Sequence, residues 1–208
     1  MLEQADVFEA GYRSVRKERQ EKVDAMRFPK DKMLSLGAGL LLKKTLLLSG
    51  VDYDRAKLAV TDTGKTFLPE HPVCFNLSHS GTRVMCAVSS KDVGCDIEQA
   101  GTIDLTIAKR FFHESESDVI FSEPDPERQK LLFFRFWTLK ESYQKATGLG
   151  FSLPLNLFRI RLGDPVTVYR PGSEERFYFR EFNPRDGYLY ACCGKADSFS
   201  ELREVSLF

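Results

Sequence analysis

The chain has 208 residues, with 30 Lys plus Arg and 30 Asp plus Glu, so its formal net charge at pH 7 is zero. A chain of this length can bury a sizeable core, as one domain or as two small domains packed together. Nothing in this overall charge argues for a nucleic-acid or acidic-membrane surface. We therefore expect no nucleic-acid partner, and we expect any anionic ligand to be bound by a local basic cluster.

The cysteines and the apolar segments indicate where in the cell the protein is expected to be. The five cysteines are odd in number, include no CxxC pair, and lie mostly in apolar, strand-like runs. This is typical of reduced, buried thiols in a cytoplasmic protein. The first 20 residues are charged throughout, which is unlike a signal peptide. The longest apolar stretch, residues 33–48, is interrupted by Lys43 and Lys44 and is too short to span a bilayer, so we expect no membrane segment.

The first half of the chain reads as helix followed by strands. The basic segment 12–28 is compatible with helix or coil. Asp31 is a plausible N-cap for a helix whose apolar residues recur at spacings of 3, 4 and 7 up to Ser49 and Gly50. Short turns separate the strand-like runs that follow, which predicts an antiparallel meander. These runs are 57–60, 73–77, 84–88 and 93–98.

The second half repeats this plan. A short helix is expected at 104–112 and a long one at 127–147, ending at Gly148 and Gly150. The predicted core stripe of the long helix is Leu132, Phe136, Leu139, Tyr143 and Ala146. Strand-like runs follow at 157–162, 166–169, 176–182 and 188–193. We therefore predict an α+β fold of two pseudo-symmetric halves, 1–100 and 101–208, each a long helix packed on an antiparallel β-meander.

Two carboxylates lie on one face of the strand VGCDIE, residues 93–98. Alternate strand residues share a face, so Asp96 and Glu98 point the same way. An isolated D-x-E is usually an exposed pair on an edge strand. Here the flanking residues are apolar or small, which indicates a central strand, and two like charges on one face are costly unless a cation offsets them.

A third carboxylate, Glu141, lies on the long helix four residues before Lys145. Such i,i+4 pairs are common on solvent faces and contribute only about 0.3–0.5 kcal/mol. However, Trp137 precedes Glu141 by one turn on the same stripe, which favours a partly buried face. If this stripe meets the face carrying Asp96 and Glu98, three hard oxygen ligands and an ammonium surround one position. Mg²⁺ is commonly held in this way, together with water and substrate phosphates.

The segment FNLSHSG, residues 75–81, contains adjacent Ser78 and His79. Neighbouring strand residues face opposite ways, so these two cannot form a nucleophile–base pair, and there is no GxSxG elbow. Asn76, Ser78 and Ser80 would share one face. These side chains suit either phosphate oxygens or the capping of their own turn, and the residues alone leave both open.

A Gly-Lys-Thr tripeptide at 64–66 is not a P-loop, because Ala59 stands where the first glycine of GxxxxGK[ST] is required. Lys65 could still contact a phosphate.

Taken together, these segments resemble the 4′-phosphopantetheinyl transferases, specifically the longer, surfactin-type (Sfp-type) group. The matching stretches occur in the family's order. They are GK at 64–65, FNLSHSG at 75–81, VGCDIE at 93–98, IAKRFF at 107–112 and FWTLKESYQKATGLGFSLPL at 136–155. The resemblance implies transfer of the phosphopantetheine arm of coenzyme A to a serine of an apo acyl or peptidyl carrier protein. It also implies a pseudo-dimeric monomer with coenzyme A in the cleft between the two halves.

The resemblance further implies a metal and catalytic set. Asp96, Glu98 and Glu141 resemble the Mg²⁺ ligands, and Lys145 resembles the lysine near the pyrophosphate. The serine hydroxyl under transfer must lose a proton, which Glu141 or a water that it orients can accept. Asp96, Glu141 and Lys145 are therefore the expected catalytic residues.

The expected coenzyme A contacts come from the same resemblance. They are Lys65, Ser78, His79 and Lys145, with Lys22 or Lys32 replacing the arginine that usually contacts the 3′-phosphate. Two other functions are compatible with these residues. One is a non-catalytic module that binds coenzyme A or a carrier protein. The other is a different Mg²⁺-dependent phosphoryl or nucleotidyl transferase.

Overall fold

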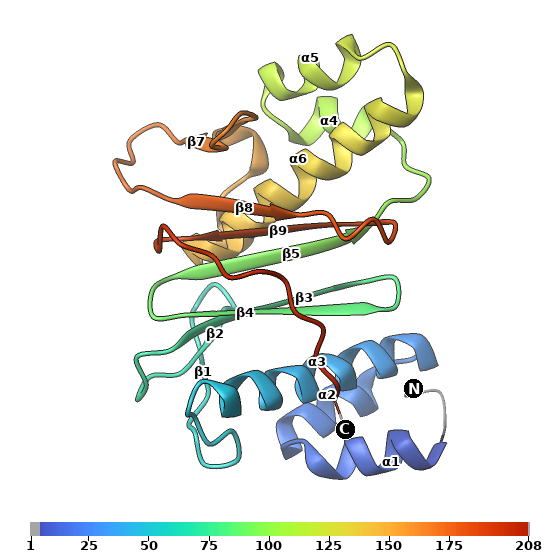
Figure 1. The fold of residues 1–208 in the computed structure, drawn as a ribbon, viewed down its shortest axis with the longest axis vertical. Coiled ribbons are helices and arrows are strands. Elements are labelled where there is room, and N and C mark those ends of the chain that lie inside the picture. Colours follow the sequence, from blue (N-terminus) through green and yellow to red (C-terminus); the bar gives the residue numbers. More distant parts are fainter. Residues whose placement is uncertain (1–4, 208) are drawn as a thin grey trace.

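The computed structural model of the protein describes residues 5–207. Strands lie between two groups of helices, one at each end of the molecule (Figure 1). Among the described residues no helix is both long and apolar enough to cross a membrane.

The N-terminal group contains three helices, α1 (Ala5–Ser14), α2 (Lys17–Ala25) and α3 (Pro29–Leu48). The helix α3 begins at Pro29, with Phe28 as its N-cap, so the prediction that Asp31 caps it is wrong. Proline suits this position because the first turn of a helix has no acceptor for its N–H. Asp31 lies within the first turn, where a negative charge complements the helix dipole.

The C-terminal helices are α4 (Thr106–Phe111), α5 (Glu114–Ser122) and α6 (Pro126–Thr147), followed by two 3₁₀ turns, Gly150–Ser152 and Leu155–Leu157. The side chain of Asp125 caps α6 by accepting from the amides of Glu127 and Arg128. The helix ends at Gly148, whose φ of 71° is left-handed. Because glycine tolerates this conformation, it terminates α6 where the sequence predicts.

Within the described residues, the strands form four small antiparallel sheets. Two hairpins, β1 (Ala59–Val60) with β2 (Thr66–Phe67) and β3 (Cys74–Ser80) with β4 (Arg83–Ser89), belong to the first half. The remaining strands are β5 (Val93–Gln99), β6 (Arg159–Arg161), β7 (Thr167–Tyr169), β8 (Tyr178–Phe182) and β9 (Tyr188–Gly194). They pair as β5-β9-β8 and as β6-β7.

The strand β5 departs from the predicted meander. Its backbone ladder runs to β9, with Asp96 opposite Ala191, and not to the preceding strand β4. The prediction of one meander through residues 84–98 is therefore wrong at this step, while the α+β class with antiparallel strands is confirmed. The division at residue 100 stays a prediction.

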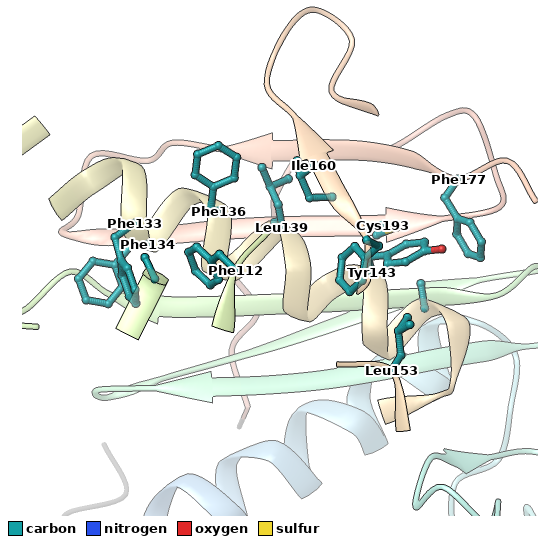
Figure 2. Close-up of a cluster of buried hydrophobic side chains, with 14 of the residues drawn as sticks. Phe112, Phe133, Phe134, Phe136, Leu139, Tyr143, Leu153, Ile160, Phe177 and Cys193 are labelled. Atoms are coloured by element: carbon teal, nitrogen blue, oxygen red, sulfur yellow. The ribbon is translucent and has the colours of Figure 1, made fainter. Parts of the chain in front are cut away.

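The largest core cluster packs the inner face of α6 against the β5-β9-β8 sheet. Figure 2 shows Phe136, Leu139 and Tyr143 of α6 among other aromatic and aliphatic side chains, which include Phe112, the residue after α4, and Ile160 of β6. Of the predicted stripe, these three residues and Ala146 are buried, and Leu132 packs against the cluster. The predicted core face of α6 is thus confirmed.

The last segment, residues 195–207, has no regular structure and runs from β9 back to the N-terminal helices (Figure 1). Phe199 packs on the cluster around Cys95 and Ile97. Leu207 packs on the cluster formed by α1, α2 and α3. The two ends of the molecule are therefore connected by this strap as well as by the strands.

Candidate active site

The strands β3 and β5 lie side by side, but side chains connect them in place of a backbone ladder. Oδ1 of Asn76 accepts from the amide of Cys95 at 2.9 Å. The hydroxyl of Ser78 accepts from the amide of Ile97 at 3.3 Å, and that of Ser80 from the amide of Gln99 at 3.1 Å. The three polar residues of β3 therefore share one face, as predicted, and they satisfy the backbone of β5.

The same hydroxyls position the two carboxylates of β5. Ser78 Oγ donates to Asp96 Oδ1 at 2.7 Å, and Ser80 Oγ donates to Glu98 Oε2 at 2.8 Å. Asp96 is only 2% exposed, and its Oδ2 has no hydrogen-bond partner in the described part of the chain. A buried carboxylate oxygen without a donor is costly, so Oδ2 is an open position for a cation or a donor from outside the chain.

Close packing at Gly94 brings α6 onto β5. A Cβ atom at this position would lie 2.2 Å from the carbonyl oxygen of Ser142 and 2.3 Å from the amide nitrogen of Ala146. Only glycine leaves room for a helix backbone at this distance. This contact allows the charged stripe of α6 to reach the carboxylates of β5.

The two predicted stripes meet at Lys145. Its ammonium donates to Asp96 Oδ1 at 2.6 Å and to Ser78 Oγ at 3.2 Å. Glu141 lies one turn earlier on the same face of α6 and is partly buried. The interpretation of Glu141 and Lys145 as a fully solvated pair is therefore wrong.

Burial dominates the electrostatics of this group. Burial raises the pKa of Asp96, while Lys145 and Ser78 act in the opposite direction. Burial, and then the charge of Asp96, raises the pKa of Glu98. Burial also raises the pKa of Glu141, against the effect of Lys145. For Lys145, burial alone would lower the pKa, but the contact with Asp96 holds it above its ordinary value. The pair therefore favours the ammonium form of Lys145, and the unfavourable part is the burial of carboxylate charge.

Within residues 5–207, no three His, Cys, Asp or Glu side chains are gathered closely enough to hold a metal ion by themselves. Mg²⁺ needs fewer protein ligands than that, since it is usually bound through one or two carboxylates, with water and substrate phosphates completing its shell. The open Oδ2 of Asp96, with Glu98 on the same strand face, fits this mode of binding. The assignment of Asp96, Glu98 and Glu141 as ligands stays a prediction.

A cavity of about 460 Å³ lies beside this group and is lined by residues from both halves of the chain. Lys145 lines it and also contacts Asp96, so the cavity and the carboxylates share this side chain. Most charged residues that line the cavity are basic, and Glu18 is the acidic residue among them. These basic residues are Arg16, Arg19, Lys22, Lys65 and Lys145.

The structure separates the predicted coenzyme A contacts into two groups. Lys22, Lys65 and Lys145 line the cavity, whereas Ser78, His79 and Lys32 are not among its lining residues. Ser78 is buried against Asp96 and His79 is exposed. The binding roles of these residues stay predictions.

Arg19 is a cavity residue that sequence reasoning missed as a site residue. Its guanidinium donates to the carbonyl oxygen of Ser35 at 3.3 Å, and no carboxylate in the described chain forms an ion pair with it. Burial lowers its pKa. The signal was available in the spacing of Arg19 and Lys22, which places them on one face once α2 is known to be helical.

The comparisons decide the family. A model of the 4′-phosphopantetheinyl transferase superfamily matches residues 92–193. A 4′-phosphopantetheinyl transferase of Bacillus subtilis is 35% identical over 202 residues, covering 94% of this chain and 88% of that protein. This chain belongs to the 4′-phosphopantetheinyl transferase family.

Other family members agree. The transferase gsp of Aneurinibacillus migulanus is 35% identical over 93% of this chain and 82% of its own length. The transferase Sfp of Bacillus subtilis strain 168 is 36% identical over 73% of this chain and 68% of its own length. The resemblance to the Sfp-type transferases is thus confirmed. A holo-[acyl-carrier-protein] synthase structure from Thermotoga maritima is 18% identical, with a TM-score of 0.42, and the match covers 50% of this chain and 61% of that chain.

Proposed function

We propose that this 4′-phosphopantetheinyl transferase transfers the 4′-phosphopantetheine arm of coenzyme A to a serine hydroxyl of an apo acyl or peptidyl carrier protein. The products are the holo carrier and adenosine 3′,5′-bisphosphate. Family membership supports the reaction class. The observation that carries the proposal to this site is the position of Lys145, which lines the basic cavity and contacts the buried Asp96.

The basic cavity suits the anionic end of coenzyme A. We assign its 3′-phosphate to Arg19 and Lys22, since these line the cavity and Arg19 has no ion pair with a carboxylate in residues 5–207. The pyrophosphate would then lie toward Lys145, whose ammonium offsets negative charge on the leaving phosphate. Arg19 is partly buried, and a bound phosphate would compensate the cost of burying its charge, whereas Lys22 is exposed.

Asp96 and Glu98, with Glu141, would hold a Mg²⁺ ion on the pyrophosphate. The open, buried Oδ2 of Asp96 supports this assignment. When bound, the ion would neutralise charge on the phosphate oxygens during transfer.

The reaction itself is one displacement at phosphorus. The serine oxygen of the carrier forms a bond to the phosphorus next to the pantetheine, and the bridging P–O bond of the pyrophosphate breaks. The hydroxyl proton passes to the carboxylate of Glu141 or to a water molecule that Glu141 orients. The electron pair of the broken bond leaves with adenosine 3′,5′-bisphosphate, beside Lys145.

One chain carries the whole proposed site, because both halves line the cavity. We therefore propose that the protein acts as a monomer. The five cysteines are all free thiols, which suits the cytoplasm.

The test is transfer of a labelled pantetheine arm from coenzyme A to a panel of apo carriers with MgCl₂, followed by intact mass of the carrier. We expect the mass of one phosphopantetheine on the carrier, no transfer to a carrier whose serine is replaced by alanine, and loss of transfer in EDTA. No transfer to any carrier by the folded protein would contradict the proposal.

Ligand competition separates the other two functions. Tight coenzyme A binding without turnover would identify a binding module. Displacement of coenzyme A by ATP but not by adenosine 3′,5′-bisphosphate would identify a different phosphoryl or nucleotidyl transferase.

A further inference from the structure

The tip of the β1–β2 hairpin reaches across from the N-terminal half to the end of α6. The ammonium of Lys65 donates to the carbonyl oxygen of Lys145 at 2.7 Å, and to those of Val93 and Ala146 at 3.2 and 3.3 Å. The hydroxyl of Thr63 donates to the carbonyl oxygen of Gly148. Two side chains of one hairpin thus bond the backbone of the last turn of α6 and the residue after it.

A helix end needs such partners. The last four carbonyl groups of an α-helix have no acceptor role within the helix, and they carry the negative end of its dipole. Lys65 brings a positive charge to two of these four carbonyl groups. This is a C-terminal cap supplied by a segment about 80 residues away in sequence.

The capped residue is the one that contacts Asp96. The backbone carbonyl of Lys145 accepts from Lys65, and the side chain of Lys145 donates to Asp96 at 2.6 Å. We propose that Lys65 is a positioning residue, which fixes the last turn of α6 and so holds the Lys145 ammonium at Asp96. This rests on the proposed function, because Lys145 is there the group that faces the leaving phosphate.

The contacts distinguish this role from direct coenzyme A binding. An ammonium has three N–H donors, and three carbonyl oxygens already accept from Lys65. Lys65 lines the cavity. The aliphatic part of its side chain packs beside Gly148, where a Cβ atom would lie 3.4 Å from Cδ of Lys65. Burial lowers the pKa of Lys65, and the charge of Asp92 acts in the opposite direction. The hydrogen-bond partners of the ammonium are the three carbonyl groups.

Three variants test the role by kinetics, with Lys65→Met as the main change and Lys65→Arg as the conservative rescue. Lys57→Met is the matched control, because Lys57 is an exposed lysine of the same half whose partner is Glu70 at 4.0 Å. We expect Lys65→Met to lower kcat by about 10- to 100-fold, since small misplacements of catalytic groups have effects of this size. We expect the KM for coenzyme A to change by less than about threefold, because Lys65 has no free donor for the ligand. Lys65→Arg should recover most of kcat, and Lys57→Met should match the wild type.

An effect of Lys65→Met on KM in place of kcat would overturn the proposal. A KM for coenzyme A raised tenfold or more at unchanged kcat would make Lys65 a ligand contact. If Lys65→Met fails to fold, Thr63→Val removes only one hydrogen bond of the same cap and should lower kcat in the same direction by a smaller factor.

Hydrogen exchange tests the cap without any turnover. In the free protein, amides 146–150 should exchange about tenfold faster in Lys65→Met than in Lys57→Met, since the cap is a charged hydrogen bond at a helix end. Unchanged exchange would contradict the cap. Because this readout needs no substrate, absence of transfer by the wild type would refute the proposed function alone.

Discussion

The ammonium of Lys145 lies 2.6 Å from Oδ1 of Asp96, although the two residues come from a helix and a strand 49 positions apart. Asp96 is buried, whereas the Lys145 side chain keeps 26% of its surface exposed toward the cavity. The pair therefore connects a dry carboxylate to a basic, solvent-accessible space. The pair contributes little to the stability of the fold, because the cost of burying the Asp96 charge offsets much of its attraction to Lys145. We therefore expect the pair to serve ligand binding.

Replacing Asp96 with asparagine should separate activity from stability. The change keeps the shape and removes the buried charge. We expect turnover to fall by about two orders of magnitude or more. We expect the free energy of unfolding to stay within about 1 kcal/mol of the wild type, because Lys145 is exposed enough to hydrate. The transfer assay and urea unfolding measure the two effects.

Asp92→Asn is the control, since Asp92 pairs with Lys195 at the surface. Near-normal turnover in a folded Asp96→Asn variant would exclude Asp96 from the reaction.

Gly94→Ala should displace α6 from β5. Its Cβ would lie 2.2 Å from a backbone oxygen, so the helix must move. We expect a loss of about 1–3 kcal/mol in the free energy of unfolding, together with a fall in kcat. Gly101→Ala is the matched control, since the nearest atom to its Cβ is 3.9 Å away. Equal stability of the two variants, measured by thermal unfolding, would show that the helix and strand are not in this close contact.

The buried ion pair of Lys140 and Glu116 should behave differently from a surface pair. Lys140 and Glu116 are 0% and 1% exposed and lie 2.7 Å apart. Lys140→Met leaves the Glu116 charge buried without its cation, and should lower the free energy of unfolding by about 3–5 kcal/mol. The double variant Lys140→Met with Glu116→Gln should lose less, because no charge is left unpaired.

Urea unfolding of the single and double variants measures this difference. A double variant less stable than Lys140→Met alone would contradict the expectation. Lys130→Met, which breaks a surface pair with Glu127, should cost no more than about 0.5 kcal/mol.

The buried thiols should make stability fall at alkaline pH. Burial raises the pKa of Cys86 and Cys192 to about 12, and raises the pKa of Cys95 and Cys193 well above the ordinary value of 9.0. Above about pH 9 the unfolded chain releases thiol protons that the folded chain retains, so this contribution to stability is full below pH 9 and is lost as the pH rises toward 12.

The urea midpoint should therefore be lower at pH 10 than at pH 8, and Cys192→Ala should show a smaller decrease. If the urea midpoint fell equally in the wild type and in Cys192→Ala, Cys192 would not contribute to the pH dependence of stability.

Local patterns were sufficient for the elements that carry the chemistry. The spacing of apolar residues predicts α6 to within one residue, because its apolar stripe and its terminal glycine both act locally. The alternation of residues 93–98 predicts which side chains share a face, since that depends only on strand geometry.

The pairing of strands that are distant in the sequence could not be predicted from local patterns. The sequence predicts β5 beside β4, because short turns favour hairpins, yet β9 supplies its backbone partner from about 95 residues away. The sequence left residues 12–28 as helix or coil, because this segment has few apolar residues and so a weak helical periodicity. In the structure, Val23 is the buried residue of α2. The family resemblance places Lys65 at coenzyme A, and only the fold shows that its ammonium donates to carbonyl groups at the end of α6.

The strand β5 takes its backbone partner from one half and its side-chain partners from the other. A break in the loop after Gln99 would leave β5 on the N-terminal fragment and β9 on the C-terminal one. Each fragment would then expose one edge of the same ladder, with Asp96 on one piece and Lys145 on the other. The transferase is thus organised as a split enzyme would need to be, with its charged pair complete only when the two fragments rejoin.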